Sequence, residues 1–537
     1  MTKESISRSI DSALRKISEI DRQQGIKTLF NQNRNRAKQF SFQIDDLYLD
    51  FSKTHLTSEL VDIYCDYAAE IALEDKKHGL FTGEHINVTE DRAVLHTLLR
   101  DSDNQGIQDT QQDYLQQAKI AKQQFTEQYD LLNSQLAARS EKIKDIIHVG
   151  IGGSSLGSQL AFEALSQTVE DIRIHFVANI DAHQLVSVLA QCDVKTTLVI
   201  GVSKTFTTAE TLQNLDSIAA WFRDNGVENV EQDFIAVTAS QDNALAYGIN
   251  DSNVVAFPTW VGGRYSVWSS VSLSVALALG MEKFNAFLAG AASMDKYFYQ
   301  TDLSKNACFL AAAVDHYYVN YFSAGSRAIF AYDYRLRSLV NYLQQLETES
   351  NGKDRQLDGS STDQQTSPVI WGGVGTDVQH SVFQLLHQGT HFIPSEFILV
   401  KSPDHVFVEH HNELLANGIA QTAALLVGQD KNDVEAQFKG DSSATELIKK
   451  SKLFSGDRPS ITFLLSQLNP YNLGALLAFY EHRTFCSGVL VNINSYDQMG
   501  VELGKKLAKT IRPLIDNKNQ SGEDIDPSTQ ALLDRIN

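Results

Sequence analysis

The sequence predicts an α/β protein in which two doubly wound, mostly parallel sheets follow a helical N-terminal region. Three observations support this fold class. The chain has 537 residues, which is too many for a single hydrophobic core. Short apolar runs begin to alternate with helical stretches near residue 145, and a second set of such runs begins near residue 327. Because this alternation is typical of parallel strands joined by crossover helices, we expect one α/β domain from each set.

The composition narrows the class of protein and of partner. Apolar residues make up 42% of the chain and charged residues 21%, which is ordinary for a globular protein. A formal net charge of −20 argues against nucleic acid or an anionic membrane as a partner. The four cysteines form no CxxC pair, which fits a reducing compartment. Since the N-terminus lacks a secretory pattern and no apolar stretch approaches about 20 residues, we expect a cytoplasmic location.

The elements are expected in the following order. Residues 1–120 form the helical region, 121–285 the first α/β domain, 286–515 the second, and 516–537 a polar tail. In the helical region, Asn87 or Thr89 is expected to cap a helix that turns its apolar residues inward, Ala93, Val94 and Leu98. The apolar runs predict strands at residues 146–149, 172–177, 198–202 and 234–237, and then at 327–332, 368–373, 396–400 and 488–493.

Two loops that follow predicted strands are candidates for holding a phosphate group. Glycines surround Ser154 in the segment 150–157, and glycines directly after a strand let backbone N–H groups approach an anion. The segment matches neither the dinucleotide-binding nor the Walker pattern, so a nucleotide is not the favoured ligand. The segment 203–210 places small hydroxyls and Lys204 at a strand-to-helix junction. A tight turn explains the first loop alone and helix capping the second, but together they favour a phosphate site at one sheet edge.

Two charged residues are candidates for the chemistry. Glu349 closes an amphipathic helical run and precedes Asn351-Gly352, which are expected to end the helix in left-handed conformations. Such a carboxylate could serve as a general base, or it could be an ordinary solvated helix end. Arg264 follows two glycines whose backbone freedom could aim its planar guanidinium inward, although a surface arginine after a turn fits as well.

Histidines form a third group of candidates. If Asp377 or Thr376 caps the next helix, His380 lies in the first turn, where an imidazole could shuttle protons near neutral pH. A purely structural histidine is the alternative. His387 and His391 have the i, i+4 spacing of metal ligands, but no carboxylate completes a recognisable set, so no metal site is expected.

The last candidates lie near the C-terminus. Ser495 and Gln498 have the spacing of a capping box. If a helix starts there, Gln498 and Lys505 share one face and could present an amide and an ammonium group to a sugar. Lys505 could equally be a solvated surface residue.

Taken together, these segments resemble the phosphoglucose isomerase family. Residues 262–269 and 496–505 are similar to the two signature motifs of that family, and residues 87–100, 349–353 and 379–390 match as well. The resemblance covers most of the chain and is specific, because several long motifs occur in the same order; Leu98 stands where the family more often has alanine. It implies two domains of the sugar-isomerase (SIS) type. It also implies reversible isomerisation of glucose 6-phosphate to fructose 6-phosphate through an enediol, in glycolysis and gluconeogenesis, without a cofactor or metal.

The resemblance implies a role for each candidate residue. Glu349 would be the base that moves the proton between C2 and C1, His380 and Lys505 would assist ring opening, and Arg264 would face the enediolate. Glu210 would orient the histidine. The residues implied to bind the substrate or its phosphate are Gly153, Ser154, Ser203, Lys204, Thr205, Thr208, Gln345 and Gln498. Members of the family form homodimers in which the histidine reaches the pocket from the neighbouring subunit.

Two other functions remain open from the sequence. A non-catalytic sugar-phosphate sensor would keep the 203–208 loop but would not need Glu349, His380 and Lys505 together. An isomerase that also accepts mannose 6-phosphate would keep all of these residues.

Overall fold

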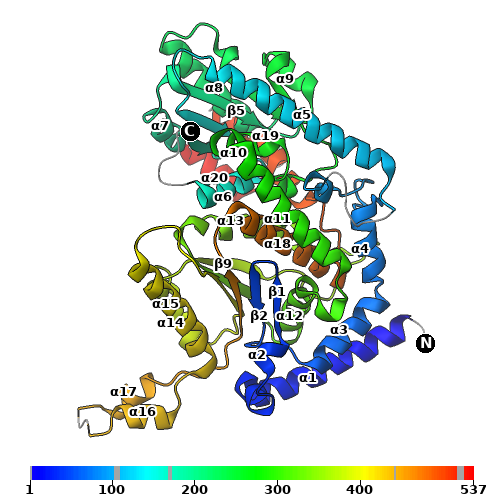
Figure 1. Ribbon diagram of the computed structural model, residues 1–537, viewed down its shortest axis with the longest axis vertical. Helices are drawn as coiled ribbons and strands as arrows, with labels where there is room; N and C mark the ends of the chain where they lie inside the picture. The colour runs from blue at the N-terminus through cyan, green and yellow to red at the C-terminus, as the bar shows by residue number, and fades with distance from the viewer. Residues whose placement is uncertain (1–2, 102–108, 167–171, 441–442, 517–524, 537) are drawn as a thin grey trace. The chain divides into compact units, whose positions relative to one another are not determined.

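The computed structural model describes residues 3–101, 109–166, 172–440, 443–516 and 525–536. The chain forms two compact units, residues 1–495 and residues 496–537. The first unit contains both sheets (Figure 1). In the part of the chain that the structure describes, every helix is too short or too polar to span a lipid bilayer. The domain boundaries expected within the first unit stay predictions.

The first sheet consists of five parallel strands in the order β4-β3-β5-β6-β7. Its strands are β3 (Asp145–Val149), β4 (Arg173–Val177), β5 (Thr197–Val202), β6 (Phe234–Thr238) and β7 (Val254–Ala256). Four of them confirm predicted runs, whereas β7 has only three residues and leaves too little pattern to predict. One face is covered by α7 (Ala182–Leu189), α8 (Ala209–Asp224) and α9 (Gln241–Tyr247), whose apolar residues share a core with β3, β5 and β6.

The second sheet has six strands in the order β1-β2-β11-β10-β8-β9. Its strands are β1 (Ser41–Ile44), β2 (Leu47–Asp50), β8 (Ser326–Tyr332), β9 (Val369–Val374), β10 (Ser395–Val400) and β11 (Ser460–Leu465). The last four run parallel, while β2 of the hairpin β1–β2 pairs antiparallel with β11. Helices α14 (Gln379–Gln388) and α15 (Val408–Val427) share a core with β8 and β10 around Phe330 and Phe397. The doubly wound, mostly parallel fold is therefore confirmed, and the hairpin is an addition that was not expected.

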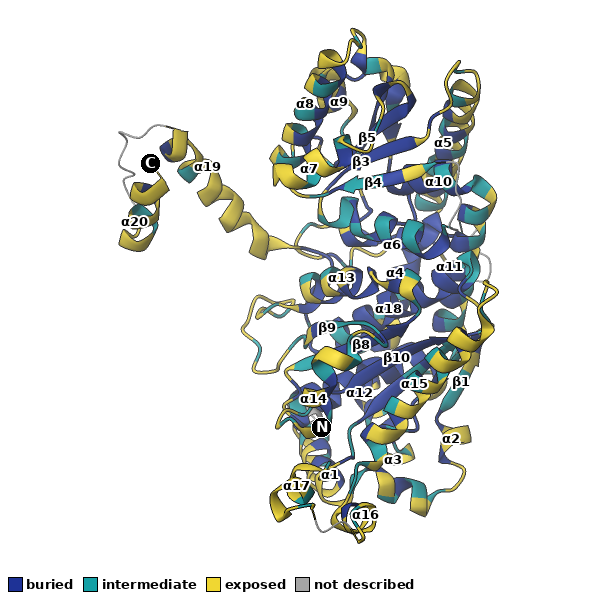
Figure 2. Ribbon diagram, turned by 90° about the vertical axis from the view of Figure 1, so that its left-hand side faces the viewer, coloured by how far each residue is buried: buried dark blue, intermediate teal, exposed yellow. Residues whose placement is uncertain are grey.

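The strand predicted at residues 488–493 is wrong. Residues 488–490 end the helix α18 (Pro470–Leu490), which is buried on nearly all sides (Figure 2), and a turn at residues 491–492 follows it. It packs tightly on α11 (Met281–Gln300), because a Cβ added at Gly474 would lie 2.0 Å from the carbonyl oxygen of Phe287. A helix buried all round has no polar face and so no helical period, which is why its apolar end resembled a strand.

The N-terminal region is helical as expected, apart from the hairpin. Its helices are α1 (Lys3–Gln32), α2 (Arg36–Gln39), α3 (Ser58–Glu70), α4 (Leu73–Thr82) and α5 (Gln112–Ala137). The helix predicted after Asn87 or Thr89 is wrong, since an isolated bridge pairs Asn87 with Arg92 and only a 3-10 turn follows at His96–Leu99. The Asn87 side-chain oxygen accepts a hydrogen bond from Asn494 at 2.9 Å instead of capping a helix. The predicted apolar residues are nevertheless buried: Ala93, Val94 and Leu98.

The remaining helices complete the two units. In the first unit these are α6 (Leu156–Leu165), α10 (Leu273–Leu279), α12 (Ala307–Tyr321), α13 (Leu339–Leu343), α16 (Lys431–Gln437) and α17 (Glu446–Ser451). The second unit contains α19 (Glu502–Asp516) and α20 (Pro527–Ile536).

Candidate active site

The glycine loop after β3 lies against two other parts of the chain. Gly152 has a left-handed backbone (φ +59°), and a Cβ there would lie 3.0 Å from the Gln345 side-chain nitrogen. A Cβ at Gly153 would lie 2.2 Å from the carbonyl carbon of Gly263. The backbone contact at Gly153 leaves no room for a side chain, and the left-handed backbone at Gly152 favours glycine, so this loop lies close against the segments that carry Gln345 and Arg264.

A buried histidine supports the glycine loop from the strand that precedes it. His148, in β3, has its Nε2 atom 2.7 Å from the Ser154 carbonyl oxygen and its Nδ1 atom 2.8 Å from the Ser274 hydroxyl. Burial lowers the pKa of His148 to about 4, so the ring is neutral and its Nε2–H donates to Ser154. Sequence reasoning missed this residue, although a histidine inside an apolar strand directly before a glycine loop was a visible signal.

The hydroxyl-rich loop after β5 is held by its own side chains. The Ser203 hydroxyl lies 3.0 Å from the Thr208 hydroxyl and accepts the Phe206 N–H at 3.1 Å. Thr208 is the N-cap residue of α8, but its side chain makes no capping hydrogen bond. The hydroxyls of Thr205 and Thr207 lie 2.7 Å apart. Because β3 and β5 are neighbouring parallel strands, their following loops open on the same edge of the sheet.

Lys204 ties this loop to the segment before Arg264. Its ammonium donates to the carbonyl oxygens of Thr259 at 2.8 Å and Val261 at 3.0 Å. Burial, with a smaller contribution from the nearby Arg92, lowers the pKa of Lys204 to about 8. The lysine therefore connects two segments of the candidate site.

Glu349 lies at the end of a π-helix, Gln344–Glu349, that continues α13. Its Oε2 atom accepts a hydrogen bond from the Gln345 amide at 2.9 Å and lies 3.6 Å from the Nη1 atom of Arg264. The Glu349 side chain is 23% exposed and that of Arg264 only 2%. π-Helical turns are rare in proteins. Those that do occur are often found at functional sites, because such a turn moves side chains out of the regular helical register.

The predicted left-handed helix end after Glu349 is wrong, since neither Asn351 nor Gly352 has a positive φ. The Asn351 side chain is instead buried, where its amide donates to the Thr484 carbonyl oxygen at 2.9 Å. Glycine is required at position 352 for another reason, because a Cβ there would lie 2.5 Å from the Thr348 carbonyl oxygen.

The opposite face of the π-helix is anchored in a buried ionic cluster. The Arg327 guanidinium donates to both oxygens of Glu347, at 2.5 and 2.7 Å, and also contacts Asp315 and Glu396. Arg483 pairs with the same Asp315 and Glu396. Burial raises the pKa of Glu347, and Arg327 opposes this shift. Charges in predicted strands and in an apolar helix were the only sequence signal for this cluster, and sequence reasoning missed it.

His380 is the second residue of α14 and lies in its first turn, as predicted. The expected cap is wrong: Val378 holds the N-cap position and makes no side-chain capping bond. The His380 side chain is exposed in the first unit. Among the described residues, no hydrogen bond or ion pair joins His380 to Glu349 or to the half-buried Glu210.

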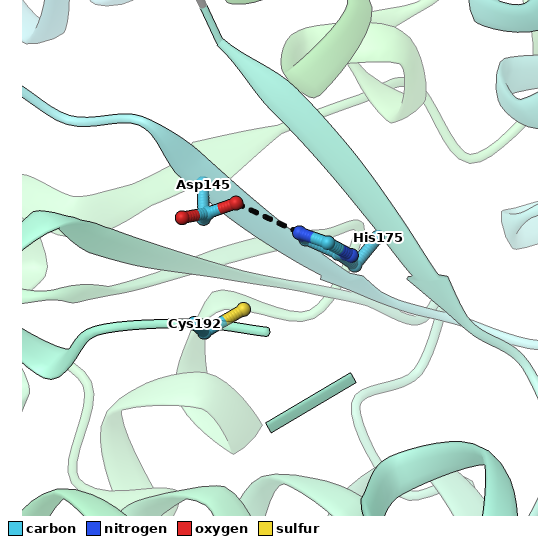
Figure 3. Close-up of side chains that lie close together, drawn as sticks. All are labelled: Asp145, His175 and Cys192. Carbon is cyan, nitrogen blue, oxygen red and sulfur yellow. Dashed lines mark hydrogen bonds and ion pairs between the residues drawn. The ribbon is translucent and has the colours of Figure 1, made fainter. Parts of the chain in front are cut away.

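Two groups of side chains have the residue types of a metal site. His387 pairs with the Gln421 side chain at 3.0 Å. In the described part of the chain, the ligand atoms of Asp145, His175 and Cys192 lie within 4.8 Å of one another (Figure 3). Asp145 already contacts the His175 ring at 2.8 Å and the Arg173 guanidinium at 2.8 Å. Since Arg173 neutralises this carboxylate, the cluster is a satisfied ionic network at the amino ends of β3 and β4.

Of the C-terminal candidates, Ser495 ends the first unit, and Gln498 and Lys505 belong to the second. The predicted capping box is not formed, because Gln498 precedes a 3-10 turn (Met499–Val501) and makes no capping hydrogen bond. Helix α19 begins only at Glu502, so Gln498 and Lys505 do not share a helical face as predicted. Within this unit the Lys505 ammonium pairs with Glu502 at 2.9 Å.

The fold and the loops that meet at this edge of the first sheet define an α/β enzyme of the sugar-isomerase type. A family model described as phosphoglucose isomerase matches residues 50–533. The chain is 42% identical over 508 residues to the glucose-6-phosphate isomerase of Rhizorhabdus wittichii, which covers 94% of this chain and 95% of the relative. It is 41% identical over 526 residues to that of Zymomonas mobilis, covering 98% and 97%. The chain belongs to the phosphoglucose isomerase family.

Solved structures agree with this assignment. The crystal structure of a glucose-6-phosphate isomerase from Chlamydia trachomatis superimposes with a TM-score of 0.83 at 29% identity, covering 98% of this chain and 97% of that one. A hypothetical protein from Thermus thermophilus has the same fold, with a TM-score of 0.62 at 22% identity, covering 86% of this chain and 99% of that one.

Proposed function

We propose that this protein catalyses the reversible isomerisation of glucose 6-phosphate to fructose 6-phosphate through an enediol or enediolate, as a step of glycolysis and gluconeogenesis. The observation that carries the proposal is the position of the Glu349 carboxylate. It is partly exposed, is hydrogen-bonded to Gln345 and lies 3.6 Å from the buried guanidinium of Arg264, and the glycine loop lies against both segments.

The phosphate of the substrate is held at the edge formed by the two loops. Hydroxyls from Ser154, Ser203, Thr205 and Thr208, with backbone N–H groups around Gly153, supply the donors that a phosphate dianion requires. Thr208 supports this role because its hydroxyl does not cap its own helix. Lys204 contributes positive charge and holds the neighbouring segment in place.

Glu349 removes the proton from one of the neighbouring carbons C1 and C2 and returns it to the other. One carboxylate suffices for this reaction, because the same base accepts and then donates the proton. Arg264 lies beside the carboxylate and stabilises the negative charge that develops on the enediolate oxygen. Gln345 orients Glu349 and lines the pocket.

Binding energy from the phosphate group supplies the remaining part of the rate acceleration. A placed general base contributes roughly 10²–10⁴-fold, and a donor for the developing oxyanion contributes about 10²–10³-fold. Enzymes typically reach about 10⁶-fold or more, so part of the acceleration comes from fixing the open-chain sugar by its phosphate.

The remaining roles follow the family resemblance. His380 and Lys505 assist opening of the sugar ring, Gln498 lines the pocket, and Glu210 orients the histidine. We also propose a homodimer in which His380 enters the pocket of the neighbouring subunit. Its exposed position on α14, away from any described partner at the Glu349 site, supports this arrangement. A cytoplasmic location fits the reaction and stays a prediction.

An activity assay with three substrates tests the proposal. The purified full-length protein is incubated with glucose 6-phosphate, fructose 6-phosphate or mannose 6-phosphate, each with and without a chelator. Interconversion of the first two, with no effect of the chelator, is the expected result. Tight binding of the sugar phosphates without turnover would instead identify a sensor, and turnover of mannose 6-phosphate would identify a broader isomerase.

A further inference from the structure

Ser350 is a buried residue that joins the candidate base to the candidate arginine. Ser350 follows Glu349 directly in the chain and is fully buried (0% exposed). Its hydroxyl oxygen accepts a hydrogen bond from the Nε atom of Arg264 at 2.6 Å and lies 3.0 Å from the Tyr265 hydroxyl. Tyr265 is itself hydrogen-bonded to Arg264, so the three side chains form a closed, buried group.

Two acceptors fix the orientation of the Arg264 guanidinium. Its Nε atom donates to the Ser350 hydroxyl, and its Nη2 atom donates to the Ser495 carbonyl oxygen at 2.5 Å. Because a guanidinium is planar and rigid, fixing two of its nitrogens also fixes the third. That third nitrogen, Nη1, is the one that lies 3.6 Å from the Glu349 carboxylate.

We propose that Ser350 is a positioning residue, which sets the placement of Arg264 relative to Glu349. The carboxylate and the hydroxyl that holds the guanidinium belong to consecutive residues, so one turn of helix orients both groups. This inference rests on the proposed function, since it needs Arg264 to act on the enediolate. A misplacement of about 1 Å in such a group can cost about 10²-fold in rate, so one hydroxyl is enough to matter.

A structural role is the alternative to this proposal. A buried hydroxyl that only satisfies its neighbours would stabilise the fold without affecting the chemical step selectively. The two roles differ in one measurable respect, because a positioning residue acts through Arg264 and has little left to do once that guanidinium is gone.

The test is a double-mutant cycle in the full-length protein. Variants Ser350→Ala, Arg264→Lys and the combination of both are compared by steady-state kinetics with fructose 6-phosphate. Affinity for sorbitol 6-phosphate, which has the phosphate but no carbonyl group to isomerise, is measured alongside. We expect Ser350→Ala to lower kcat about 10–100-fold with little change in sorbitol 6-phosphate affinity, and to lower it less than about 3-fold further in the Arg264→Lys background.

Controls separate this effect from a loss of folding. Ser272→Ala removes the hydroxyl of another fully buried serine, which donates to the Val267 carbonyl oxygen at 2.7 Å, and should leave kcat unchanged. If Ser350→Ala does not fold, Ser350→Cys keeps nearly the same volume with a weaker acceptor and replaces it in the cycle. Melting temperatures are recorded for every variant.

The experiment distinguishes failure of the positioning role from failure of the proposed isomerase function. An inactive wild-type protein would contradict the isomerase assignment itself. If the wild type is active, an unchanged kcat in Ser350→Ala would overturn the positioning role alone. The positioning role would also be overturned if Ser350→Ala lowered kcat as much in the Arg264→Lys background as it does in the wild-type background.

Discussion

Glu347 and Glu349 show how position within one turn decides what a carboxylate can do. Glu347 is buried against Arg327, whereas Glu349 is 23% exposed beside Gln345 and Arg264. The two residues are separated by one residue in a π-helical turn, so their side chains leave the helix in different directions. Only Glu349 is open to a substrate, and its environment is therefore the one suited to proton transfer.

Replacing Glu349 with glutamine tests its role as the base. The amide keeps the size of the side chain but cannot take up a proton, so kcat should fall roughly 10²–10⁴-fold. Affinity for sorbitol 6-phosphate should stay nearly the same, because the proposed phosphate site lies in other loops. Kinetics and isothermal titration calorimetry provide the two measurements. Equal loss of both properties would mean that Glu349 is architectural.

His148 gives the protein a specific sensitivity to acid. Its pKa is lowered to about 4 in the folded state from an ordinary value of 6.5, so between these values the unfolded chain binds more protons than the folded one. Stability is therefore lost as the pH falls from about 6.5 towards 4.

The variant His148→Gln can keep the hydrogen bond to the Ser154 carbonyl oxygen but cannot titrate. Its melting temperature should fall less than that of the wild type between pH 6.5 and pH 4.5, as measured by differential scanning calorimetry. The exposed His183→Gln is the matched control and should follow the wild type. Parallel curves for His148→Gln and the wild type would contradict a neutral, buried His148.

At the scale of single elements, a substitution in the loop before α8 tests the phosphate site most directly. Thr208→Val removes a hydroxyl that lies 3.0 Å from Ser203 and is not needed to cap the helix. A lost hydrogen bond to a charged group should weaken sorbitol 6-phosphate binding about 10-fold or more. Thr211→Val, one turn further along α8, is the control, because its buried hydroxyl has no partner among the described residues. Equal affinities in the two variants would argue against the phosphate site.

The π-helix depends on the ionic cluster beneath it. Arg327→Met would leave Glu347, Asp315 and Glu396 buried with Arg483 as their remaining cationic partner. Removing one member of a buried ion pair costs about 3–5 kcal/mol, and urea denaturation followed by fluorescence would measure the loss. The exposed pair Arg15–Asp11 offers a control, since Arg15→Met should change stability by less than about 1 kcal/mol. Similar losses in both variants would show that burial of the cluster contributes nothing.

Local patterns in the sequence predicted most strands and the loops that follow them. Eight apolar runs predict strands, and all but the run at residues 488–493 coincide with strands to within a residue or two. The error at α18 and the missed hairpin β1–β2 share a physical cause, because both are decided by burial against distant segments. The ends of the helices carrying Glu349 and His380 were predicted wrongly for a related reason. Tertiary contacts of Asn351 with Thr484, for example, override the local preference of Asn-Gly.

At the scale of the whole molecule, the proposed dimer predicts a complementation effect. Glu349→Gln and His380→Asn variants are each expected to be nearly inactive. If the histidine comes from the neighbouring subunit, mixed dimers contain one intact site and one site with both changes. Unfolding and refolding an equal mixture should then restore about a quarter of wild-type activity. No recovery above the separate variants, with mixed dimers verified by mass spectrometry, would place His380 in its own subunit's site.

The hairpin β1–β2 has a consequence for how the protein can be shortened. It supplies the antiparallel neighbour of β11, through pairs such as Leu49 with Phe463. The family match begins at residue 50, so a fragment cut to that boundary would lose nearly all of the hairpin. The backbone N–H and C=O groups along one side of β11 would then be unpaired and free to join a strand of another molecule. A truncation chosen from the family boundaries would thus invite aggregation without removing any residue of the proposed site.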